Sequence, residues 1–101
     1  MKISKELAEK FLSDVPEPNC FWVNNGPIIR NLDDLATAFE YMDDATYSYH
    51  VNKEKNDFSN WIKDIIGDEL LAKEISKSRN KDFSLKKVEE RVLLLKKVAK
   101  R

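Results

Sequence analysis

Residues 43–67 read DDATYSYHVNKEKNDFSNWIKDIIG and contain the single histidine of the chain and one of its two tryptophans. In the second half of this segment, apolar residues recur at i, i+3, i+4, i+7 and i+8, which places them on one face of a helix. They are Phe58, Trp61, Ile62, Ile65 and Ile66. Asn56 or Asp57 can cap the first turn, and Gly67 supplies a left-handed stop. The pattern predicts a helix over residues 57–66.

The first half of this segment predicts a second, shorter helix. Asp43 and Asp44 provide its N-cap, and Tyr47 and Val51 share one face at i and i+4. The two helices meet at a polar loop, residues 52–56, which we name the corner loop. We expect the rest of the chain to wrap around this corner.

Upstream of the corner, the sequence predicts a helix, a hairpin and a further helix. Ser4 is a good N-cap for a short amphipathic helix within residues 4–12, and Asn31 is one for a helix over residues 31–42. Between them, in residues 20–30, two β-favouring runs flank an Asn-Gly pair. This is the strongest short-range signal for a β-hairpin, and a helix must cover one face of such a hairpin.

Downstream of the corner, two more helices are expected. Asp68 caps a helix that reaches Ile75, and residues 76–81 read as a polar loop. Ser84 then opens the last helix, over residues 84–101, whose apolar residues repeat at alternating spacings of three and four. They are Leu85, Val88, Val92, Leu95 and Ala99.

Length and composition favour one helical domain over residues 1–101. A chain of 101 residues is long enough to bury a core without disulfides or metal. Two glycines and three prolines are too few for a sandwich or a barrel, which need frequent turn residues. The predicted fold class is therefore mainly α (α+β), a small multi-helix bundle with one short β-hairpin.

The charge of the chain is balanced overall but uneven along its length. Residues 1–76 hold 8 basic and 15 acidic residues, whereas residues 77–101 hold 10 basic and 3 acidic ones. We expect the basic C-terminal helix to dock against the acidic body. The alternative is a nucleic-acid interface, because lysine and arginine side chains neutralise phosphates. Its candidate contacts are Lys86, Lys87, Arg91, Lys96, Lys97, Lys100 and Arg101.

Catalysis and cofactor binding receive little support from the residues. One histidine and one cysteine do not form the clustered ligand set of a metal site, and no glycine-rich loop is available for a phosphate. We expect no metal and no cofactor. A small enzyme centred on His50, with Cys20 as a nucleophile, is the least favoured function.

Two further expectations concern the surroundings of the protein. No apolar run approaches the length of about 18 residues that spans a bilayer, so no membrane association is expected. A single cysteine agrees with a reducing, cytoplasmic compartment. The apolar seam of the last helix can be buried within the chain or against a copy of it, so both a monomer and a homodimer stay open.

Several segments together give a resemblance to a known family. They are the aromatic-aliphatic-Asn-Gly pattern of Phe21–Leu35, Tyr49-His50-Val51-Asn52, Lys55-Asn56-Asp57-Phe58, Asn60-Trp61 and Gly67-Asp68. With this pattern, summarised as YHxNxxKNDFxNWI, the chain resembles an uncharacterised, mainly archaeal family of prokaryotic domains of unknown function. The resemblance covers residues 20–95 and leaves the N-terminal helix, residues 1–15, outside. It implies a small helical accessory domain and no particular reaction, cofactor or site.

The expected function is a non-enzymatic binding or scaffolding module with a protein or peptide partner. Its face would combine the hairpin with the corner, where exposed aromatic residues contribute most of the binding energy. The candidate binding residues are Trp22, Asn24, Tyr49, His50, Asn52, Lys55 and Asn56. For His50, the structural alternative is a tie from the helix end to a backbone carbonyl or to Asp57. For the corner loop, the structural alternative is that its Asn and Asp residues serve only as helix caps and turn formers.

Overall fold

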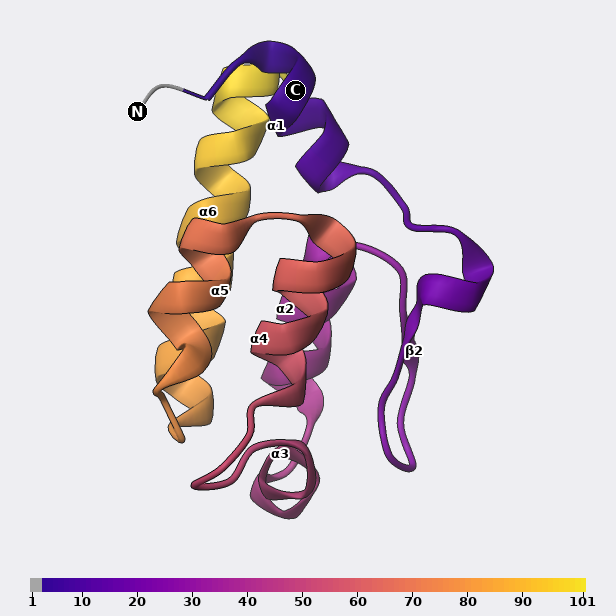
Figure 1. The fold of residues 1–101 in the computed structure, drawn as a ribbon, viewed down its shortest axis with the longest axis vertical. Helices are drawn as coiled ribbons and strands as arrows, with labels where there is room; N and C mark the ends of the chain where they lie inside the picture. The colour runs from indigo at the N-terminus through magenta and orange to yellow at the C-terminus, as the bar shows by residue number, and fades with distance from the viewer. Residues whose placement is uncertain (1–2) are drawn as a thin grey trace.

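Helix α6 (Lys81–Ala99) is the longest element of the computed structural model, which describes residues 3–101. Helices α1 (Lys5–Leu12), α2 (Leu32–Tyr41) and α5 (Glu69–Ser76) pack against it. Helix α4 (Asp57–Trp61) packs against α5, and α3 (Asp44–His50) crosses the lower end of the molecule in Figure 1. The prediction of a mainly helical small bundle is confirmed.

A two-stranded antiparallel hairpin lies along the side of the bundle, at the right of Figure 1. Strand β1 (Phe21–Trp22) pairs with β2 (Ile28–Ile29), with Phe21 opposite Ile29 and Trp22 opposite Ile28. A short 3-10 helix, η1 (Glu17–Asn19), precedes β1, and β2 borders α2. The predicted hairpin is confirmed, with strands of only two residues each.

The hairpin loop is formed by residues 24–26. The N–H of Val23 donates to the carbonyl oxygen of Pro27 at 3.2 Å, and the N–H of Gly26 donates to that of Val23 at 3.0 Å. Asn25 takes a left-handed φ of 56°, which asparagine tolerates better than most residues. The Asn-Gly signal thus marks the turn, although the loop has three residues.

Side chains of asparagine, aspartate or serine cap all six α-helices of the described residues at their N-termini. Each accepts a hydrogen bond from the backbone N–H three positions later, which satisfies one of the free donors of the first turn. The caps are Ser4, Asn31, Asp43, Asn56, Asp68 and Asn80. The sequence predicted Ser4, Asn31 and Asp68 singly, and Asp43 and Asn56 each together with the aspartate that follows it.

The sixth cap corrects the predicted start of the last helix. Helix α6 begins at Lys81 behind Asn80, whose side-chain oxygen accepts from the N–H of Phe83 at 3.0 Å. Ser84 is instead fully buried in the first turn, where its hydroxyl lies 2.9 Å from that of Tyr47. The apolar repeat begins only after this polar, largely exposed turn, so periodicity alone placed the start too late.

The predicted helix over residues 57–66 is α-helical only as far as Trp61. Its second half is a π-helix, η2 (Ile62–Ile66), which is closed by a 2.7 Å hydrogen bond from the N–H of Gly67 to the carbonyl oxygen of Ile62. Gly67 has a φ of 92° and is the predicted left-handed stop. Because a π-turn is wider than an α-turn, the apolar stripe shifts, and Ile65 is only half-buried.

The buried apolar side chains form one cluster to which every α-helix contributes. Phe58 is its centre, because its ring contacts rings from three other segments. The centroid of Phe58 lies 4.8 Å from Phe21, 4.9 Å from Phe39 and 5.9 Å from Tyr47. The hairpin, α2 and α3 are therefore joined through the first turn of α4.

The basic helix α6 docks on the acidic body through ion pairs, as predicted. Lys96 lies 3.0 Å from Asp33 of α2, and Lys87 lies 3.6 Å from Glu74 of α5. Arg91 makes a buried pair with Asp68, with the guanidinium Nε 2.7 Å from a carboxylate oxygen. These pairs hold α6 against two different helices.

Candidate functional site

His50 is buried at the C-terminus of α3, with 5% of its surface exposed. Its Nε2 accepts a 3.0 Å hydrogen bond from the backbone N–H of Asn24 in the hairpin loop. An accepting Nε2 carries no proton, so the ring proton is on Nδ1, which lies 3.1 Å from an oxygen of Asp57. His50 therefore ties the hairpin loop to the start of α4, and of the two structural alternatives for this residue, the contact with Asp57 is the one observed.

Aromatic residues surround this tie. The His50 ring lies 5.0 Å from Phe21, 4.9 Å from Tyr49 and 5.2 Å from Phe58, between ring centroids. Trp61 is buried, as predicted, and its indole N–H donates to the carbonyl oxygen of Asn19 at 2.8 Å. The first strand of the hairpin is thus held on the bundle by its inward side chain and by the segment before it.

The amide side chains of the corner loop are used within the chain. Asn52 accepts from the N–H groups of Glu54 and Lys55 at 2.8 and 3.0 Å, which forms a local turn. Asn56 is buried and caps α4, and its Nδ2 donates to the carbonyl oxygen of Ile75 at 3.0 Å. The side chains of Asn52 and Asn56 therefore have structural partners within the chain.

The predicted binding residues thus divide into two groups. His50 and Asn56 are buried and Asn24 is half-buried, so these three residues support the exposed surface and contribute little to it. An approaching molecule meets the exposed members, which are Trp22, Tyr49, Asn52 and Lys55. The ammonium of Lys55 lies 3.0 Å from Asp57.

The outer face of the hairpin is the most apolar exposed part of this region. Trp22 and Ile28 stand opposite each other across the two strands and are 68% and 43% exposed. Side chains alternate along a strand, so Cys20 and Arg30 lie on the same face. A hollow of about 470 Å³ follows this face toward the linker before β1. It is lined by Asp14, Val15, Glu17, Cys20, Trp22, Ile28 and Arg30.

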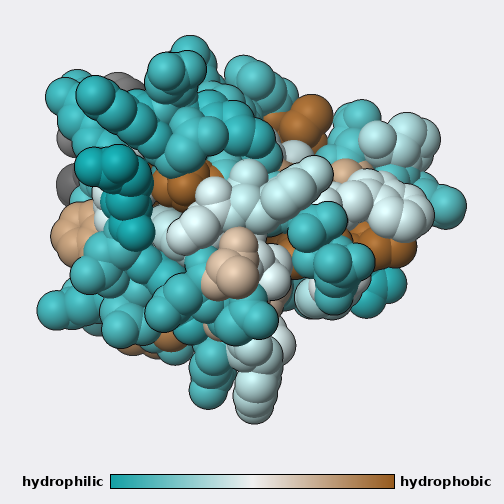
Figure 2. All heavy atoms as spheres, turned by 90° about the horizontal axis from the view of Figure 1, so that it is seen from below, coloured by the Kyte–Doolittle hydropathy of each residue, from teal (hydrophilic) through white to brown (hydrophobic). Residues whose placement is uncertain are grey.

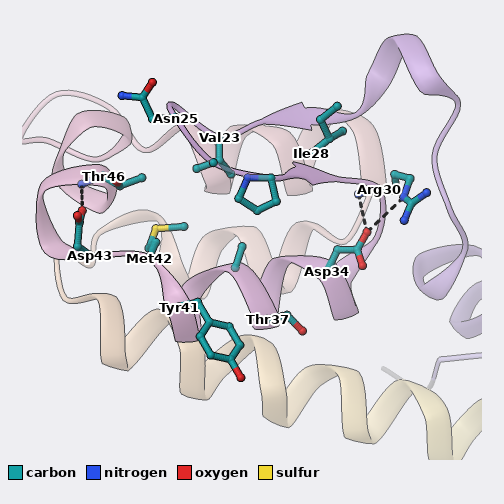
Figure 3. Close-up of a pocket in the computed structure, with 13 residues that line it drawn as sticks. Val23, Asn25, Ile28, Arg30, Asp34, Thr37, Tyr41, Met42, Asp43 and Thr46 are labelled. Atoms are coloured by element: carbon teal, nitrogen blue, oxygen red, sulfur yellow. Dashed lines mark hydrogen bonds and ion pairs between the residues drawn. The ribbon is translucent and has the colours of Figure 1, made fainter.

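A groove of about 490 Å³ lies between the hairpin and α2 and continues to the start of α3 (Figure 3). We name it the hairpin groove. Figure 3 shows Val23 reaching from the hairpin toward α2, and Arg30 beside Asp34 at the opposite end from Asp43. Its lining is Val23, Asn25, Gly26, Pro27, Ile28, Arg30, Asp34, Thr37, Ala38, Tyr41, Met42, Asp43 and Thr46. No sequence pattern indicates this groove, because it forms between two segments that each show only ordinary helix or hairpin signals.

The wall of the groove that α2 and α3 supply is acidic. Asp34 of α2 and Asp43 at the start of α3 line it, and residues 31–52 contain no lysine or arginine. Hydrogen bonds from the backbone and side chain of Thr46 hold the pKa of Asp43 below its usual value, so this carboxylate is ionised at neutral pH. On the other side of α3, burial raises the pKa of Tyr47, and its hydrogen bond with Ser84 opposes this effect.

The candidate phosphate contacts on α6 are also divided. Lys87, Arg91 and Lys96 are engaged in the ion pairs described above. Within the described residues, no ion pair is found for Lys86, Lys97, Lys100 and Arg101, three of which are at the C-terminal end. Arg91 is buried, so it is not available to a phosphate.

The end of the molecule around α3 is mostly polar. Figure 2, which views the α3 end from below, shows mostly hydrophilic atoms with small separated hydrophobic areas. Among residues 3–101, no group of three or more histidine, cysteine, aspartate or glutamate residues is placed to hold a metal ion. None of the helices described here has the length and apolar character needed to cross a bilayer.

Comparisons of the chain with protein-family models, with curated proteins and with solved structures gave no match. The resemblance to a prokaryotic domain family therefore stays a prediction.

Proposed function

We propose that this chain is a non-enzymatic binding module for another protein, and that the outer face of the hairpin is its recognition surface. The observation that carries the proposal is the exposure of Trp22 on a hairpin that the bundle holds rigidly. Tryptophan is enriched among the residues that dominate binding energy, and its burial on association releases a large apolar area.

The support beneath Trp22 explains why this exposure favours binding. An isolated two-stranded hairpin is marginally stable in water. Here Phe21 packs on Phe58, and the N–H of Asn24 is bound by His50, so both ends of β1 are anchored. A pre-positioned aromatic side chain loses little conformational entropy when a partner covers it.

The two alternative functions have weaker support. A catalytic His50 would need a ring nitrogen open to a substrate, yet both ring nitrogens have protein partners. A nucleic-acid interface on α6 would have to rely on the basic residues at its C-terminal end. We therefore place the recognition surface on the hairpin side.

Trp22→Ala is expected to abolish partner binding while leaving the fold intact. Loss of a central tryptophan typically costs about 2 kcal/mol or more, a weakening of about thirty-fold. The measurement is retention of proteins from a nuclease-treated cell extract on the immobilised chain. The matched control is Leu70→Ala on α5, which also removes a large apolar side chain, 56% exposed, at another place on the surface.

The proposal predicts bands that the wild type and Leu70→Ala retain and that Trp22→Ala loses, with unchanged thermal melts. Bands that Trp22→Ala retains as well as the wild type would contradict it. Bands that appear only without nuclease would favour the nucleic-acid function instead.

A further inference from the structure

We infer that the hairpin groove is the docking site for a basic, extended peptide segment of the partner protein. This inference rests on the proposed function and specifies the chemistry of the partner. It is carried by the apolar floor of the groove, by its acidic wall and by the strand edge that borders it.

The floor of the groove is apolar. Val23, Ala38 and Met42 are buried but contribute surface to it, and Pro27 adds the ring of a residue without a backbone N–H. A volume of about 490 Å³ lies within the range of ligand-binding clefts. The floor therefore suits a few aliphatic side chains.

The charges around the floor favour a cation. Asp34 and Asp43 line the groove, and of the lining residues in the described chain Arg30 alone is basic. Its guanidinium lies 3.6 Å from Asp34, so Asp43 is left without a cation within the groove. Outside the groove, the ammonium of Lys81 donates to the carbonyl oxygen of Met42, and its positive charge adds to the lowering of the Asp43 pKa. Lysine or arginine side chains at the rim would complement this wall.

The strand edge favours an extended conformation. Opposite residues of two antiparallel strands alternate between hydrogen-bonded and non-hydrogen-bonded pairs. Val23 and Pro27 form a hydrogen-bonded pair, because the N–H of Val23 donates to the carbonyl oxygen of Pro27. The next pair, Trp22 with Ile28, is therefore non-hydrogen-bonded, so the N–H and carbonyl of Ile28 point away from β1, on the side of β2 that borders α2.

The chain already uses this edge at Arg30, whose N–H donates to a carboxylate oxygen of Asp34 at 3.1 Å. The carbonyl of Arg30, two residues beyond Ile28 on the same edge, accepts a 2.8 Å hydrogen bond from the N–H of Val15. A peptide bound at Ile28 would repeat this contact, as in other complexes where a strand is added to a sheet edge. Side chains of an extended peptide alternate, so aliphatic residues face the floor while basic residues face the acidic rim.

The test uses a fluorescein-labelled hexapeptide of alternating lysine and leucine, titrated with the full chain and followed by fluorescence anisotropy. The groove variant carries Asp34→Asn and Asp43→Asn. Asparagine is as good an N-cap as aspartate, so the cap of α3 is kept. The control variant carries Asp33→Asn and Asp44→Asn, which remove the same charge from the same two helix ends but do not line the groove.

The control is also matched in its ion pairs, because Asp33 pairs with Lys96 as Asp34 pairs with Arg30. We expect the groove variant to bind the peptide about two- to thirty-fold more weakly than the wild type, since each exposed ion pair contributes modestly. The control variant should bind within about two-fold of the wild type. Peptides with glutamate for lysine, or serine for leucine, should not bind measurably.

Equal weakening in both variants would overturn the inference, because general surface acidity would then explain binding. If the peptide with serine for leucine bound as tightly as the original peptide, the apolar floor would have no role in binding. This result would also overturn the inference. So would a concentration-dependent doubling of mass in light scattering that the peptide cannot reverse, because a second copy would then occupy the groove. If Trp22→Ala loses the partner while the groove variant keeps it, the recognition surface stands and only this inference fails.

Discussion

Replacing Arg91 with alanine is expected to lower the free energy of unfolding by about 3 to 5 kcal/mol, because it leaves a buried carboxylate without its partner. Asp68 is 1% exposed and Arg91 is 9% exposed, and two guanidinium nitrogens donate to the two carboxylate oxygens at 2.7 and 2.9 Å. Asp68 also caps α5 by accepting from the N–H of Leu71. One carboxylate thus joins α5 to α6.

Urea unfolding measures this loss, and a double variant identifies its cause. Asp68→Asn with Arg91→Met keeps the cap and removes both charges, so it should recover most of the stability that Arg91→Ala loses. The control, Lys87→Ala, breaks only partly exposed ion pairs on the same helix and should cost less than about 1 kcal/mol. A stability of Arg91→Ala equal to that of Lys87→Ala would show that the buried pair does not hold the two helices.

Phe58→Ala is expected to destabilise the chain by about 3 to 5 kcal/mol, through lost burial and the cavity that remains. The side chain is fully buried, and the rings around it come from the hairpin, α2 and α3. Because these rings come from separate segments, their collapse into the cavity would require several elements to shift together. The loss of free energy of unfolding should therefore lie near the upper end of this range.

Phe83→Ala is the matched control for this variant. The same atoms are removed from a ring that is 42% exposed on α6, so the loss should be about 1 kcal/mol or less. Thermal and urea unfolding of both variants test the comparison. Near-equal losses would show that Phe58 is not the packing centre of the fold.

The local elements of this fold could be predicted from sequence because their signals are local. Asn31, Asp43 and Asp68 start helices by the hydrogen bonds of their own side chains, and Gly67 stops one by its left-handed backbone. The errors arose where a signal was shared or weak. Asn80 and Ser84 are both capping residues, and only tertiary packing against α3 shows that Ser84 is buried.

The candidate site was predicted only in part. Asp57 could be named as one of two structural partners for the histidine, because the two residues are seven positions apart on adjoining helices. Its second partner, the N–H of Asn24, is 26 positions away and depends on where the hairpin lies. The role of Arg91 was hidden for the same reason, since a basic residue on a basic helix gives no sign of a buried partner. The hairpin groove required the placement of β2 beside α2.

The most direct test of the recognition surface is a map of backbone amide shifts in the ¹⁵N-labelled chain, as the protein retained by the wild-type column is added. We expect the largest changes in residues 20–30 and 34–46, with the amides of α6 nearly unchanged. The largest changes in α6, with the hairpin amides unperturbed, would contradict it and place the recognition surface on the basic helix.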